Sequence, residues 1–195
     1  MPLTKLNNKA VANVTTLPVA LGDMVLVSSA TASSSASIEF SLGNYKEYKF
    51  FFVNIHPSGD TDNFQFQTSI NSGSSYGVTA TTTVFNAYHN ESDSATALGY
   101  QTSFDLAQST SFQLLAESGN DNDQNCSGYL HIFNPSSTTY IKHFISRASM
   151  TQRSDYQQDH FTAGYFNTTS ALTNIKFQMS SGNIDAGKIL MFGIN

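Results

Sequence analysis

The sequence predicts an all-β protein: an antiparallel β-sandwich, jelly-roll-like, with an extended N-terminal arm. Three observations support this prediction. Short runs of β-branched and aromatic residues recur at intervals of about 8–14 residues, separated by Gly, Pro, Asn and Ser. Charged residues make up only 12% of the chain, about half the usual share, and uncharged polar residues take their place. Finally, 15 Phe and 9 Tyr can supply a hydrophobic core.

The strongest predicted strand runs from Glu47 to His56. Its aromatic and β-branched residues fit the pleated surface of a sheet. From Phe50 to Val53 it is apolar on both faces, which predicts a central position between two layers. Pro57 to Asp60 ends the strand, because proline lacks an amide donor. From Phe64 to Ile70, apolar and polar residues alternate, so we expect a neighbouring strand with one buried face.

Two shorter strands are predicted before this one. Met24 to Val27 is apolar and forms the first, and Ile38 to Phe40 opens the second. Between them, Thr31 to Ser37 is rich in Ser and Ala and low in complexity. This composition predicts a loop or linker between the arm and the body of the protein.

Further strands are predicted along the rest of the chain, each bounded by turn-forming residues. They are expected at 78–88, 112–116, 128–133, 140–148, 161–166, 172–179 and 188–194. Between His89 and Gly99 we expect an irregular excursion, with a helical turn near Ala95 to Leu98. Alternation predicts one shared strand face for Tyr140, Lys142, Phe144 and Ser146.

A chain of 195 residues is long enough for one domain that buries roughly 70% of its unfolded surface. We expect residues 1–30 to form an attachment arm and the first short strand, and residues 31–195 to form the sandwich. Residues 1–22 have no strong periodicity, which fits an arm that packs on a partner or on its own domain, or a poorly ordered tail. The apolar residues expected to make the arm's contacts are Leu3, Leu6, Val11 and Val14.

Composition argues against several classes of partner. The net charge is −5 and the nine Lys and Arg are scattered, so a nucleic-acid partner is not expected. The single cysteine, Cys126, excludes an intramolecular disulfide. No run reaches the ~18 apolar residues of a membrane span and no signal peptide is evident. We therefore expect a protein made in the cytoplasm and not inserted into a membrane.

Sites for metals and cofactors are weakly indicated. Asp60 to Asp62 and Asp121 to Asp123 resemble fragments of a calcium loop but lack the glycine and distal glutamate of an EF-hand. Solvated turns are the preferred interpretation, and a bound divalent ion is the alternative. The five histidines have no close spacing to one another or to the cysteine, and no catalytic or phosphate-binding motif occurs. No cofactor is expected.

Tyr88, Asn90 and Tyr156 are candidate glycan contacts. Tyrosine rings can stack on sugar rings while amides hydrogen-bond to hydroxyls, although Tyr and Asn are common on any polar β-surface. Sequence distance alone does not say whether these residues meet.

Three blocks of sequence carry a resemblance to a known group of proteins. They are MPLTKLNN at residues 1–8, the segment from Tyr45 to Pro57, and the segment from Gly182 to Ile194. Together they resemble small virion structural proteins of tailed bacteriophages, especially those of marine and cyanobacterial hosts. The resemblance implies a β-sandwich displayed on the particle as a fibre, head-decoration or receptor-contacting module, assembled as a homotrimer. It implies no catalytic residues.

Our leading hypothesis is therefore a non-enzymatic virion protein, exposed on the particle and attached to other virion proteins through its arm. The alternative is a carbohydrate-binding module at a fibre tip that recognises a host cell-surface glycan. A polysaccharide-degrading enzyme is a distant third, because the acidic residues do not lie in distinctive motifs.

Overall fold

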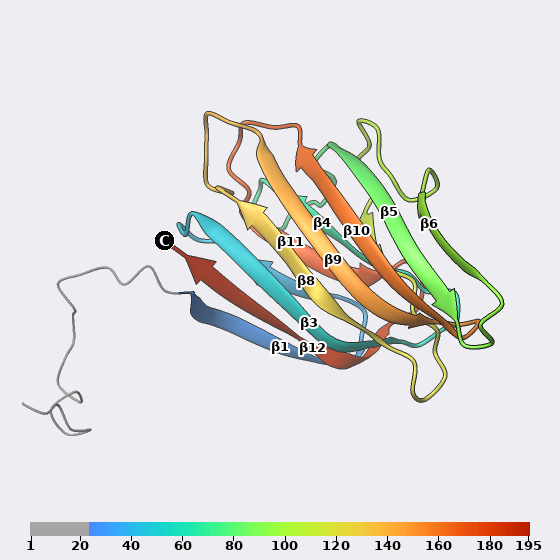
Figure 1. The fold of residues 1–195 in the computed structure, drawn as a ribbon. Coiled ribbons are helices and arrows are strands. Elements are labelled where there is room, and N and C mark those ends of the chain that lie inside the picture. Colours follow the sequence, from blue (N-terminus) through green and yellow to red (C-terminus); the bar gives the residue numbers. More distant parts are fainter. Residues whose placement is uncertain (1–23) are drawn as a thin grey trace, which may run out of the picture.

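The computed structural model describes residues 24–195, and these residues form strands, turns and loops with no helix (Figure 1). The strands are β1 (Val25–Ser35), β2 (Ile38–Ser41), β3 (Glu47–Pro57), β4 (Phe64–Ser69), β5 (Ala80–Asn90), β6 (Thr96–Tyr100), β7 (Gln113–Ala116), β8 (Cys126–Phe133), β9 (Lys142–Gln152), β10 (Tyr156–Phe166), β11 (Asn174–Met179) and β12 (Ile184–Ile194).

The strands form two sheets that pack face to face. One sheet has eight strands in the order β1-β12-β3-β8-β9-β10-β5-β6, and the other has four in the order β2-β11-β4-β7. Every paired neighbour is antiparallel. The predicted antiparallel β-sandwich is confirmed.

The order of the strands is that of a widened jelly roll. When β5, β6, β9 and β10 are set aside, the other eight strands, renumbered along the chain, pair as 1-8-3-6 and 2-7-4-5. In this order consecutive strands alternate between the two sheets except for 4 and 5, which pair within the smaller sheet, as they do in a jelly roll. The remaining four strands extend the larger sheet on one side, which Figure 1 shows as the flank ending in β5 and β6.

The core is a cluster of aromatic rings contributed by both sheets. Phe50 and Phe52 point inward from β3, and Phe64 and Phe177 meet them from the smaller sheet. The Phe52 and Phe64 rings lie 5.3 Å apart and the Phe50 and Phe177 rings 5.4 Å apart, all of them 1% exposed or less. Such pairs add about 0.5–1.5 kcal/mol beyond the burial of their area.

Strand β3 lies inside the larger sheet, between β12 and β8, in agreement with the predicted central position. Two details of the prediction are wrong. Only one face of β3 is in the core, because Val53 is 43% exposed and Phe51 is partly exposed. Strand β4 is not its neighbour but lies in the opposing sheet, where Phe64 packs against Phe52 of β3 in a T-shaped contact.

The expected linker and the expected helical turn are also wrong. Thr31 to Ser35 continues β1, paired with β12 as far as Ser35 opposite Ile184. Thr96 to Tyr100 is strand β6, paired with β5. In both cases pairing with another strand decides the conformation, with β12 at the other end of the chain for β1 and with the preceding strand β5 for β6, and local composition does not reveal either pairing.

The predicted face of β9 is correct for three of its four members. Lys142, Phe144 and Ser146 are buried on the inner face. Tyr140 precedes the strand and is 70% exposed, because the chain is still in the loop that follows Asn134.

The sandwich has two distinct ends. At the entry end β1 begins and β12 finishes, with Val25 opposite Gly193. At the far end β10 begins and β5 finishes, with Tyr156 opposite Asn90 (Figure 1). The attachment candidates lie outside the described residues, in the part of the chain that leads into the entry end: Leu3, Leu6, Val11 and Val14.

Candidate functional site

The inner face of the widened part of the larger sheet carries buried polar residues beside apolar ones such as Val84, Phe144 and Phe166. Strands β5 and β10 point four polar residues inward, and each is 5% exposed or less: Thr82, Asn86, His160 and Thr162. Three of them are held by hydrogen bonds. Asn86 bonds to His160 and to Gln101 in the loop that leads from β6 into β7, and Thr82 bonds to Leu106 of that loop and to Gln113, the first residue of β7 in the smaller sheet.

Gln113 ties this loop to the sheet. Its amide nitrogen donates to the carbonyl oxygens of Phe104 at 3.0 Å and Leu114 at 2.9 Å. Its carbonyl oxygen accepts from the Thr82 hydroxyl at 2.7 Å. The same hydroxyl accepts from the backbone amide of Leu106 at 2.8 Å. Since all these groups lie in or against a buried face, each needs its partner to avoid an unsatisfied polar atom.

His160 is the buried titratable group of this network. Burial lowers the pKa of its imidazole to about 4, so the ring is neutral at pH 7. Gln101 donates to the Asn86 carbonyl oxygen at 2.7 Å, which leaves the Asn86 amide to donate to His160 Nε2 at 3.2 Å. The ring proton therefore sits on Nδ1, which has no hydrogen-bond partner among the described residues.

Glu117 approaches the same histidine. Its carboxylate lies 3.8 Å from His160 Nε2, too far for a hydrogen bond, and burial raises the pKa of the Glu117 carboxyl. With a neutral imidazole this contact is not an ion pair. Among the described residues, the His160 imidazole has no nucleophilic side chain within hydrogen-bonding distance. Its neighbours are the Asn86 amide and the more distant Glu117 carboxylate, so the arrangement of a nucleophile beside a base is not present here.

A hollow opens at the far end, further along the same inner face. Its volume is about 250 Å³, and its lining residues are Tyr88, Gln152, Ser154, Tyr156 and Gln158. The structure thus brings together Tyr88 and Tyr156, which are far apart in the sequence: their ring centroids lie 5.4 Å apart and their planes are 77° apart. None of the lining side chains is charged.

Asn90, the third candidate glycan contact, stabilises a turn instead of lining the hollow. Its carbonyl oxygen accepts from the backbone amides of Ser94 and Ala95, both at 2.9 Å, and its amide donates to the hydroxyls of Ser92 and Ser94. With its hydrogen bonds used in this way, Asn90 shapes the turn between β5 and β6 and does not line the hollow.

Two amides that sequence reasoning missed line the hollow instead. Gln158 faces Tyr88 across β5 and β10, and Gln152 faces Tyr156 across β9 and β10. Alternation from Tyr156 would have pointed to Gln158 as a same-face residue. Gln152 carried no signal, because only the pairing of β9 with β10 brings it there.

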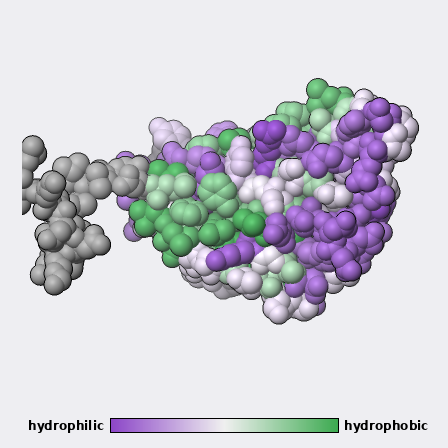
Figure 2. All heavy atoms as spheres, turned by 60° about the horizontal axis from the view of Figure 1, so that its bottom comes forward, coloured by the Kyte–Doolittle hydropathy of each residue, from purple (hydrophilic) through white to green (hydrophobic). Residues whose placement is uncertain are grey.

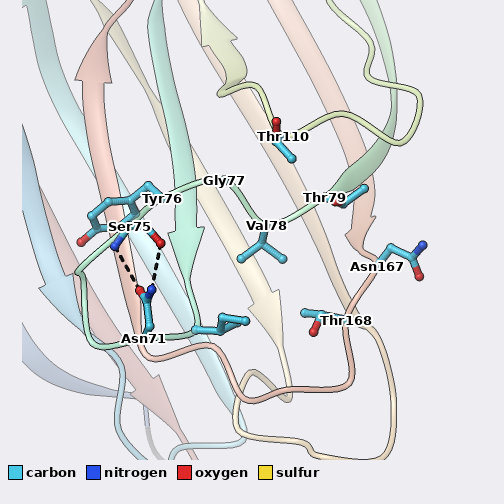
Figure 3. Close-up of a pocket in the computed structure, with 10 residues that line it drawn as sticks. Asn71, Ser75, Tyr76, Gly77, Val78, Thr79, Thr110, Asn167 and Thr168 are labelled. Carbon is cyan, nitrogen blue, oxygen red and sulfur yellow. Dashed lines mark hydrogen bonds between the residues drawn. The ribbon is translucent and has the colours of Figure 1, made fainter.

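A larger hollow of about 580 Å³ lies at the entry end (Figure 3). Its polar side chains are bonded to their surroundings. Asn71 accepts from the Ser75 backbone amide at 3.0 Å and donates to the Ser75 hydroxyl at 2.8 Å, as the dashed lines in Figure 3 mark. Asn167 donates to Gln108 at 2.7 Å. These bonds brace the loops that meet here, so size alone does not make this hollow the better candidate site.

The two aspartate-rich loops lie side by side at the far end. The backbone amide of Asn120 donates to Asp60 at 3.4 Å, and His56 Nε2 lies 3.2 Å from the carbonyl oxygen of Asp121. Within residues 24–195, however, no group of three His, Cys, Asp or Glu side chains is placed to hold a metal ion.

Three carboxylates are each engaged with a basic or histidine partner. The pairs are Glu39 with Lys176, Glu47 with His131, and Asp159 with Arg147. Cys126 is buried and free, and burial raises the pKa of its thiol to about 12, so it is a poor nucleophile in the folded protein.

The outer face of the eight-stranded sheet carries an aromatic row. Strand pairing places seven residues in one line across seven strands: Leu190, Phe51, Tyr129, Arg147, Phe161, Phe85 and Tyr100. Phe85 and Phe161 stack with centroids 4.8 Å apart. Phe85 is 42% exposed and Tyr100 51% exposed, so the row meets solvent.

A hydrophobic patch lies beside the point where the described chain begins (Figure 2). It includes four successive residues, Met24 to Val27, which are each 41–51% exposed. Because successive strand residues point to opposite faces, both faces of β1 are uncovered here. Within residues 24–195, strand β1 is also an edge of the sheet, with backbone groups along one side that pair with no other described strand.

No protein-family model matches this chain, and neither a curated protein nor a solved structure is significantly similar to it. Among the described residues there is no helix that is long and apolar enough to cross a membrane.

Proposed function

We propose that this protein is a non-enzymatic structural module of a tailed-phage particle, assembled as a homo-oligomer and held by its N-terminal arm to other virion proteins. The observation that carries the proposal is the exposed aromatic row on the outer face of the larger sheet. The phage setting comes from the resemblance of the three sequence blocks.

The row has the composition of a protein interface. An antiparallel sheet with one face on the core usually turns polar residues to water on the other. Here the outer face presents aromatic rings and an arginine, which are the residue types enriched at interface centres. Arg147 lies 4.7 Å over the Phe161 ring and is neutralised by Asp159, with which it makes short hydrogen bonds. The charge of Arg147 therefore does not oppose burial of the row against another copy. The Lys49 ammonium lies over the Tyr129 and Phe51 rings, 4.8 Å and 5.3 Å from their centroids, and a partner surface must accommodate it.

The row is also long enough for a stable contact. Seven strands at about 4.8 Å spacing span roughly 30 Å. Stable interfaces bury about 1,200–2,000 Å² in total, counted over both partners. A face of this width, together with its flanking strands, is large enough to contribute one partner's half of that area. Repeated surface proteins form closed symmetric oligomers by default, and we expect a trimer.

The positions of the two ends of the sandwich support attachment of the protein through its N-terminal arm. The arm joins the body at the entry end, beside the patch that includes Met24 to Val27. A body held there presents its far end outward. Several weak arms linked in one oligomer bind a particle more tightly than one arm alone.

Sedimentation of the full-length protein tests the assembly. We expect a trimer at micromolar concentration and a monomer for the double variant Phe85→Ser and Phe161→Ser, with a melting temperature close to that of the parent body. Gln157→Ser, exposed on the same strand as Phe161 but outside the row, is the matched control and should stay trimeric. A monomeric wild-type protein contradicts the assembly.

Deletion of residues 1–22 tests the attachment. The truncated protein should fold and oligomerise but should be lost from purified particles. Normal incorporation of the truncated protein would place the anchor elsewhere in the chain.

A further inference from the structure

The far-end hollow has the shape of an aromatic corner. Tyr88 and Tyr156 both line it, and their rings make a T-shaped contact with planes 77° apart. The apolar C–H face of a sugar ring packs against an aromatic ring, as other apolar groups do. The hollow is slightly smaller than the 300–1,000 Å³ or so of enclosed small-molecule sites, which suits one ring at the end of a glycan.

One polar side chain that lines the hollow has an unpartnered atom. The side-chain carbonyl oxygen of Gln158 is buried and makes no hydrogen bond in the part of the chain that the structure describes. An unsatisfied buried polar atom costs about 1–3 kcal/mol, so an occupant that brings hydroxyl groups recovers that free energy.

The remaining polar groups are suited to the same ligand. Gln152 accepts from the Ser154 backbone amide at 2.9 Å through its carbonyl oxygen, which leaves its amide nitrogen to donate. The hydroxyls of Tyr88 and Tyr156 make no hydrogen bond within residues 24–195. Donors and acceptors therefore surround an aromatic wall, the combination that a polyhydroxylated ring requires.

The lack of charged side chains in the hollow narrows the class of ligand further. None of the five lining residues is charged, so the hollow offers no counter-charge to a carboxylate, sulfate or phosphate. The larger hollow at the entry end is a weaker candidate, because Asn71 and Asn167 already use their amides in bracing loops.

We infer that the far-end hollow binds a neutral sugar residue of a host-surface glycan, with Tyr88 and Tyr156 packing on the ring and Gln152 and Gln158 hydrogen-bonding to its hydroxyls. This inference rests on the proposed function only in taking the far end as the outward one. The hollow lies within a single chain, so sugar binding does not require the oligomer.

The test is binding of the full-length protein to an array of neutral, acidic and amino-sugar glycans, followed by titration calorimetry with the best neutral oligosaccharide. Gln158→Met keeps the size of the side chain and removes the unpartnered acceptor, and we expect it to weaken binding about tenfold. Tyr156→Ala removes one aromatic wall and should weaken binding about 2- to 10-fold. Tyr165→Ala, on the outer face of the same strand, should bind like the wild type.

A melting curve for each variant separates lost binding from lost folding, and Gln158→Met carries the test if Tyr156→Ala does not fold. The inference is overturned if no neutral glycan binds, if acidic glycans bind better, or if both variants bind like the wild type. Glycan binding by a monomeric protein would overturn the proposed assembly alone. A trimer that binds no neutral glycan would overturn this inference alone.

Discussion

The inner face of the eight-stranded sheet differs between its two halves. Under the four-stranded sheet, β3 points aromatic rings inward, of which Phe50 and Phe52 are essentially unexposed. In the widened half, β5 and β10 point Thr82, Asn86 and His160 inward, equally buried but linked by hydrogen bonds. The first half packs its rings against the second sheet. In the widened half, Phe144 and Phe166 also pack against that sheet through Phe66, while Thr82 and Asn86 are hydrogen-bonded to Gln113 of β7 and to the loop before it.

The difference shows how one sheet can serve two purposes. Burial of rings is non-directional and stabilises in proportion to area, so the aromatic half holds the two sheets together. A buried polar network depends on each partner being present, so the polar half fixes one arrangement of the loop before β7. The same face then continues outward into the hollow at Tyr88 and Tyr156. Stability is concentrated in the first half and the candidate site in the second.

The largest expected effect is in the aromatic half. Phe52→Ala should lower the free energy of unfolding by about 3–5 kcal/mol, because it removes a ring that contacts Phe64 and Phe177 and leaves a cavity. Urea unfolding measures the change. Val53→Ala, the next residue on β3 and exposed to solvent, should cost less than about 1 kcal/mol. Equal effects of the two changes would show that β3 does not face the core in this way.

The polar half should respond to pH. His160 has a folded pKa of about 4 against an ordinary value of 6.5. Above pH 6.5 the imidazole is neutral in both states. As the pH falls from 6.5 to about 4, the unfolded chain takes up a proton that the folded protein does not, so stability falls. The full difference corresponds to a loss of about 3 kcal/mol.

Urea unfolding between pH 7.5 and pH 4 measures this dependence, and His160→Gln should flatten it. Glu117 acts in the opposite direction, since burial raises the pKa of its carboxyl and protonation then favours the folded state. Comparison of the two proteins at each pH cancels that contribution. If the free energy of unfolding depends on pH in the same way in the wild type and in His160→Gln, His160 is not the group responsible.

Breaking the network at Gln113 should have a smaller and more local effect. Gln113→Ala leaves the Thr82 hydroxyl and the Phe104 and Leu114 carbonyl oxygens without this partner, which should cost about 1–3 kcal/mol. Hydrogen exchange of residues 101–112 should accelerate while that of β3 stays slow. Uniform acceleration through both halves would mean that the loop and the aromatic core unfold as one unit.

The sequence by itself determined that the protein is an antiparallel sandwich and where most of its strands lie. Alternation of apolar and polar residues is local, so Phe64 to Ile70 could be assigned to a strand without knowledge of its partners. It also singled out Tyr88 and Tyr156 as chemically suited to a sugar, because side-chain chemistry does not depend on the fold.

Only the tertiary structure decided which strands are neighbours. The Ser-rich end of β1 and strand β6 have little local preference, and their hydrogen bonds to β12 and β5 fix them. Strand pairing likewise placed Gln152 and Gln158 beside the two tyrosines and drew Asn90 into a turn. Residues far apart in sequence meet through register, and register depends on the hydrogen bonds and buried faces of the whole sheet.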